Sequence, residues 1–76
     1  MKELVAEIAK ALVDYPDQVV VNEIKGTQST IFELRVAKED VGKVIGRKGK
    51  TALAIRTILF GVSAKMKNNY ILEIIE

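Results

Sequence analysis

The spacing of apolar and polar positions predicts a helix at the start of the chain. In residues 2–13 apolar side chains recur every three or four positions, with Glu and Lys between them, which is typical of an amphipathic helix. The apolar stripe consists of Leu4, Val5, Ile8, Ala11 and Leu12. Pro16 ends this segment, because proline disfavours helical geometry in the residue before it.

Two strands are predicted next. Residues 19–24 are rich in β-branched side chains, and residues 30–36 alternate between apolar and polar positions, which is typical of a half-buried strand. The connection at residues 25–29 contains a glycine and has the length of a hairpin loop. We therefore expect an antiparallel pair.

The residue pattern in the second half of the chain predicts a short helix, a longer helix and a last strand. Residues 38–44 begin with acids where a helix N-terminus favours them, and residues 46–49 interrupt the helix. Helical spacing resumes over residues 51–65, and residues 70–75 are apolar except for Glu73. The stripe expected to face the core of the longer helix is Ala52, Ile55, Leu59 and Val62, widened by Leu53 and Ile58.

The order α-β-β-α-α-β indicates an α+β fold, with helices packed on one face of a three-stranded sheet. A chain of 76 residues has room for one core, so we expect a single domain over residues 1–76.

Composition narrows the classes of function. The chain has no Cys and no His, so an enzyme would have to rely on carboxylates and lysines, and the acids are scattered as surface Glu-Lys pairs would be. We therefore predict no enzyme, no metal and no cofactor. Acids at Glu3 and Glu7 are atypical of a signal peptide, and no apolar run approaches the ~20 residues that span a bilayer. We expect a soluble, cytoplasmic protein with no membrane partner and no small-molecule substrate.

The formal net charge is only +2, but the positive charge is concentrated in one segment. Residues 38–67 hold eight basic and two acidic residues, whereas residues 1–37 hold four basic and six acidic residues. A cationic segment of this kind is typical of a protein that binds a polyanion on one face.

The centre of that segment is the loop Gly46-Arg47-Lys48-Gly49. Glycines let a backbone approach a phosphate closely and adopt positive φ, and the helix that follows favours an anion at its N-terminus. Arg47 and Lys48 are expected to project into solvent or toward a ligand, with Lys43 and Lys50 on either side. The loop therefore predicts an anion-binding site.

Two other nucleotide-binding motifs do not fit. A Walker A motif requires a glycine where the chain has Val44, and it follows a buried strand rather than a charged helical stretch. An RNA-recognition motif stacks bases on a set of strand aromatics, which the four aromatic residues of this chain do not form.

The run Val44-Ile45-Gly46-Arg47-Lys48-Gly49-Lys50 resembles the KH (K-homology) signature. The element order is similar to the type II KH domain, and the whole chain resembles the small bacterial single-KH-domain family KhpA. This resemblance implies an RNA-binding groove for about four nucleotides of a single strand, with the loop clamping the backbone. The RNA-binding residues implied or predicted are Gly46, Arg47, Lys48, Gly49, Lys50, Lys43 and Ile45.

The resemblance also implies protein partners and a cellular role. Members of this family form homodimers and pair with the larger KhpB (Jag/EloR) protein, in RNA-chaperone, cell-shape and cell-wall roles. An alternative class remains open, a protein-interaction or structural module that does not bind nucleic acid.

The wall of such a groove is aliphatic, and five residues near the loop are candidates for it. These are Val41, Val44, Ile45, Ala52 and Ile55. An aliphatic residue at helical spacing more often belongs to the core. Arg56 could lie near a phosphate or be an ordinary solvated arginine.

Overall fold

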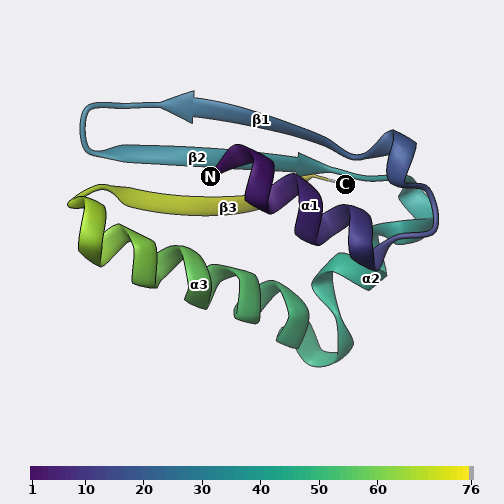
Figure 1. Cartoon of the computed structure of the whole chain (residues 1–76). Coiled ribbons are helices and arrows are strands. Elements are labelled where there is room, and N and C mark those ends of the chain that lie inside the picture. The colour runs from purple at the N-terminus through teal and green to yellow at the C-terminus, as the bar shows by residue number, and fades with distance from the viewer. Residues whose placement is uncertain (76) are drawn as a thin grey trace.

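The computed structural model describes residues 1–75 and shows the predicted order of elements (Figure 1). Glu76, the last residue of the predicted domain, lies outside that range. The elements are α1 (Lys2–Leu12), β1 (Val20–Lys25), β2 (Ser29–Arg35), α2 (Val41–Ile45), α3 (Lys50–Met66) and β3 (Asn69–Ile75). Short 3₁₀ turns lie at Pro16–Gln18, Lys38–Asp40 and Arg47–Gly49. None of the helices within residues 1–75 has the length and apolar content needed to cross a bilayer.

The sheet has the order β1-β2-β3, with antiparallel pairing of β1 to β2 and parallel pairing of β2 to β3. The hairpin was predicted, whereas the parallel pairing was not. Parallel neighbours cannot be joined by a tight turn and need a long crossover. Here α2 and α3 form that crossover, so the Gly46–Gly49 loop lies at the bend between two helices, away from the sheet (Figure 1).

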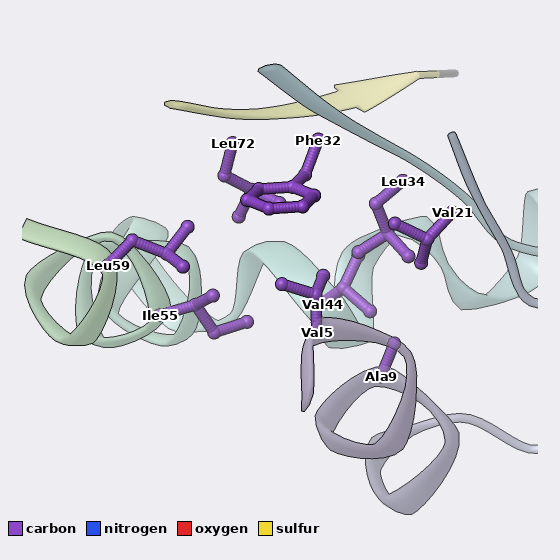
Figure 2. Packing of buried hydrophobic residues seen from close by; sticks show 9 residues of the cluster. All are labelled: Val5, Ala9, Val21, Phe32, Leu34, Val44, Ile55, Leu59 and Leu72. Carbon is purple, nitrogen blue, oxygen red and sulfur yellow. The ribbon is translucent and has the colours of Figure 1, made fainter. Parts of the chain in front are cut away.

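The core lies between one face of the sheet and the three helices, as predicted (Figure 2). Phe32 at its centre is fully buried and stacks on Tyr70, with ring centroids 5.8 Å apart. Val44 is the buried residue of α2 and belongs to this core, so the helix leading to the loop is anchored in the interior of the domain. The cluster consists of Val5, Ala9, Val21, Phe32, Leu34, Val44, Ile55, Leu59 and Leu72.

The buried stripes of α1 and α3 are narrower than predicted. Leu4 and Leu12 are 43% and 38% exposed and Ala11 is also exposed, whereas Val5 is buried as predicted, together with Ala9, which was not predicted. The expectation that Leu53 and Ile58 widen the core face of α3 is wrong. They are 62% and 48% exposed, because the helical period places Ile58 beside the buried stripe and Leu53 on nearly the opposite side of the helix. Helical spacing predicts the centre of a buried face, but the neighbouring elements decide its width.

Candidate nucleic-acid interface

The Gly46–Gly49 loop is a tight turn that α2 enters and α3 leaves. The Gly46 N–H donates to the Gly42 carbonyl at 2.9 Å, and the Gly49 N–H donates to the Gly46 carbonyl at 3.1 Å. Three of its residues have positive φ, Gly46 (79°), Lys48 (56°) and Gly49 (73°). The turn thus joins the two helices within four residues.

The two glycines are required for different reasons. A Cβ on Gly46 would overlap the Thr51 side chain and lie 2.7 Å from the Thr51 backbone nitrogen, so both space and φ exclude a side chain. A Cβ on Gly49 would meet nothing within 4 Å, so only its positive φ favours glycine there. Gly46 therefore packs the loop against the start of α3, whereas Gly49 leaves open space beside the backbone.

Three cations project from this turn. Arg47, Lys48 and Lys50 are exposed, and within residues 1–75 none of them makes an ion pair. Lys48 adopts the left-handed conformation, which is unfavourable for a residue that has a Cβ. Residues held in such conformations are concentrated at functional sites. The prediction that Arg47 and Lys48 point outward is consistent with this exposure, and their charge is available to a ligand.

The start of α3 adds a backbone contribution. The N–H groups of Gly49 and Lys50 are used within the turn, since they donate to the Gly46 and Arg47 carbonyls. No side chain within the described residues caps the following N–H groups of this 17-residue helix. A helix N-terminus without a cap carries partial positive charge and favours an anion.

Lys43 differs from the other predicted cations. Its ammonium lies 3.2 Å from Asp14 and 3.5 Å from Asp40, and its side chain is 43% exposed. The hydrogen bond to Asp14 and the charge of that carboxylate raise the pKa of Lys43 above its ordinary value, and Asp40 adds to the effect. Lys43 therefore stays charged but shares its charge with two carboxylates of the protein.

Asp40 is an organising residue that the sequence pattern did not reveal. It was predicted as an acid at a helix start, but it is fully buried and does not cap α2. Its two oxygens accept the N–H groups of Asp14 at 3.1 Å and Tyr15 at 3.0 Å, which joins the end of α1 to the start of α2. Burial alone would raise the pKa of Asp40, but these N–H donors and Lys43 together hold it below its usual value.

The five aliphatic candidates for a groove wall divide into two groups. Val44, Ala52 and Ile55 are buried, so they belong to the interior, as aliphatic residues at helical spacing usually do. Val41 and Ile45 are half-buried and lie one turn apart, on the same face of α2. Of the five, only these two present apolar surface beside the loop.

Arg56 contacts the edge strand of the sheet. Its guanidinium donates to the Leu72 carbonyl of β3 at 3.3 Å, so it is neither fully solvated nor free. Arg56, Phe60 and β3 line a hollow of about 340 Å³ between α3 and the sheet edge. The Leu72 carbonyl of this edge strand is therefore already hydrogen-bonded to the Arg56 side chain of α3.

The comparison with family models places this geometry in a known group. Residues 2–74 match the model described as "KhpA/KhpB, KH domain". The chain belongs to the KhpA/KhpB KH-domain family.

Relatives of this family match along nearly their whole length. A protein named "RNA-binding protein KhpA" from Caldanaerobacter subterraneus subsp. tengcongensis is 60% identical, covering 99% of this chain and 100% of the relative. Proteins of the same name from Clostridium acetobutylicum and Borreliella burgdorferi are 52% and 51% identical, covering 99% and 97% of this chain and 100% and 90% of each relative. No solved structure matches the chain. Membership of the KH family places the chain among non-enzymatic proteins.

Proposed function

We propose that this protein binds single-stranded RNA without catalysis, and that the Gly46–Gly49 loop clamps the sugar-phosphate backbone. The observation that carries the proposal is the loop itself. Three cations without an ion-pair partner in residues 1–75 surround a glycine turn at an uncapped helix N-terminus. That arrangement offers positive charge and backbone N–H donors to one small anionic group such as a phosphate.

Each predicted residue has a separate part in the clamp. Gly46 and Gly49 hold the turn and leave the backbone accessible, while Arg47, Lys48 and Lys50 bind phosphate oxygens. Ile45, half-buried at the end of α2, offers apolar surface to a nucleobase beside the loop. Lys43 contributes less than the other cations because Asp14 and Asp40 already neutralise much of its field.

RNA is favoured as the polyanion because the relatives that match along nearly the full chain are named RNA-binding proteins. A loop of this size holds about four nucleotides, since KH domains recognise unpaired segments of that length. Action on cellular RNA agrees with the cytoplasmic location expected from the sequence.

We further propose that the protein acts as a homodimer or with a KhpB-type partner, as an RNA chaperone in cell-shape and cell-wall control. One domain that holds few nucleotides binds weakly, and joining two such sites raises avidity through effective concentration. The exposed flank of α3 supports a protein contact, since Phe60 is 75% and Leu53 is 62% exposed. Apolar side chains of this size on a small surface are typical of interfaces.

The clamp is tested by titrating a labelled single-stranded RNA at increasing salt. Three to four phosphate contacts predict a log-log slope of roughly −2 to −3, because each contact on a single strand contributes about −0.7. A slope near zero would contradict backbone clamping. Absence of RNA binding together with concentration-dependent self-association would instead establish the interaction module as the function.

A further inference from the structure

A second hollow lies at the end of the sheet and shares only Val41 with the residues predicted for the RNA groove. It has a volume of about 650 Å³ and is lined by Arg35, Val36, Lys38, Val41 and Ile75. Arg35 and Ile75 are the last residues of β2 and β3 and are register partners in the parallel pair. Both strands run toward the side of the molecule where α2 lies (Figure 1).

The lining of this hollow has an apolar part and a cationic part. Val36, Val41 and Ile75 are half-buried and form an apolar floor, whereas Arg35 and Lys38 are exposed. Neither cation makes an ion pair within residues 1–75, and no acidic residue among them lines the hollow. An apolar floor beside two available cations suits a flat aromatic group that carries phosphate, and the volume lies in the ~300–1,000 Å³ range of small-ligand sites.

The hollow is connected to the loop through α2. Val41 begins this helix and Ile45 ends it, and a separation of four residues places both on one face. Five residues of α-helix span only about 7 Å, at 1.5 Å per residue. A strand held at Gly46–Gly49 can therefore follow the Ile45 and Val41 surface and reach the hollow with its next nucleotides.

We infer that this hollow is a second contact point for the same RNA. A nucleobase packs on Val41 and Ile75, and Arg35 and Lys38 bind the phosphates beside it. This inference rests on the proposed function, since the loop is the first contact. It adds four residues to the interface and predicts that the bound length exceeds what the loop holds alone.

The test compares random-sequence RNA tetramers with octamers, because a tetramer is about what the loop holds. In the double variant Arg35→Gln/Lys38→Gln, octamer affinity should fall about tenfold and the salt slope should weaken by about 1.4, since each of the two lost contacts contributes about 0.7, while tetramer affinity changes less than about twofold. The matched control is Lys2→Gln/Lys10→Gln, which removes the same charge from exposed positions on α1 and should bind both RNAs as the unmodified protein does.

A second variant separates shape from charge. Val41→Phe fills the hollow without removing a cation, so it should weaken octamer binding with an unchanged salt slope. Thermal melting of each variant confirms that the domain remains folded at the assay temperature. Free adenosine monophosphate binding as tightly as the octamer would overturn the inference, because the hollow would then be a mononucleotide site.

The outcomes distinguish the inference from the function on which it rests. Octamer binding that is unchanged in Arg35→Gln/Lys38→Gln, but lost in Arg47→Asp/Lys48→Asp, would overturn the second contact and leave the clamp intact. Unchanged binding in both variants would overturn both. An equal loss on tetramer and octamer would also count against a second contact, since it would reflect overall charge.

Discussion

The two ends of α3 share a backbone conformation and differ in what surrounds it. Lys48, just before the helix, has φ 56°, and Lys67, just after it, has φ 54°. After the helix, the Asn69 N–H donates to the Gln28 carbonyl at 3.0 Å and the Tyr70 N–H donates to the Ser63 hydroxyl at 2.9 Å. Before it, no side chain in the described structure caps the helix.

This difference shows where the fold satisfies its own polar groups and where it leaves them to a ligand. The C-terminal end is closed by contacts with the hairpin and with α3 itself, so its strained lysine serves chain reversal. The N-terminal end has the same strain, but beyond the backbone hydrogen bonds of the turn itself no side chain in the described residues caps it. Strain at an open, cationic helix start is the pattern expected of a binding site.

The largest effect on stability should come from Gly46→Ala. The new methyl group collides with backbone of Thr51 and the residue keeps positive φ, so we expect a loss of about 2–4 kcal/mol in unfolding free energy. Gly49→Ala should cost only about 1 kcal/mol, because its surroundings are open. Urea denaturation measures both. Gly61→Ala, within α3 and also in open space, is the control and should stabilise slightly. Equal costs at Gly46 and Gly49 would contradict the distinct packing of the two glycines.

The next effect concerns RNA affinity and compares the two ends of α3. Arg47→Asp/Lys48→Asp should weaken RNA binding roughly 100-fold, because two attractive contacts become repulsive. Lys65→Asp/Lys67→Asp makes the same charge change at the other end and should lower affinity far less. Fluorescence anisotropy with a labelled single strand measures both. Similar losses in the two variants would mean that RNA responds to overall charge rather than to the loop.

A smaller effect should mark the closed end as purely structural. Ser63→Ala removes the acceptor for the partly buried Tyr70 N–H, so unfolding free energy should fall by about 1–2 kcal/mol. RNA affinity of the folded variant should stay within about twofold of the unmodified protein. Thermal melts measure the stability of the variant, and fluorescence anisotropy measures its RNA affinity. A large change in RNA affinity would place the C-terminal end inside the interface.

The smallest effect compares the two strained lysines directly. Lys48→Gly and Lys67→Gly both relieve positive φ, and each should stabilise the fold by about 0.5–1 kcal/mol. Only Lys48→Gly should also weaken RNA binding, because it removes a phosphate contact. Denaturation and RNA titration on the same samples give the comparison. If Lys48→Gly binds RNA as well as the unmodified protein, the charge of Lys48 has no part in the clamp.

The sequence predicted the loop better than its surroundings. Gly46 and Gly49 could be identified as turn residues, and Arg47 and Lys48 as exposed, because a short loop between glycines has few conformations. Lys43 could not be separated from them, since its partner Asp14 lies 29 positions earlier and is brought close only by folding. Val44 and Ile45 are neighbours with the same chemistry, yet one is buried and the other half-buried.

The sequence by itself determined the order of helices and strands, the antiparallel hairpin and the glycine turn, because periodicity and backbone preference act between near neighbours in the chain. Tertiary structure decided the parallel pairing of β2 with β3, the burial of Asp40 and the hollow at Arg35 and Ile75. Each of these joins residues far apart in sequence. The free energy of each such contact depends on which surfaces pack together in the folded domain, and no local sequence pattern specifies that packing.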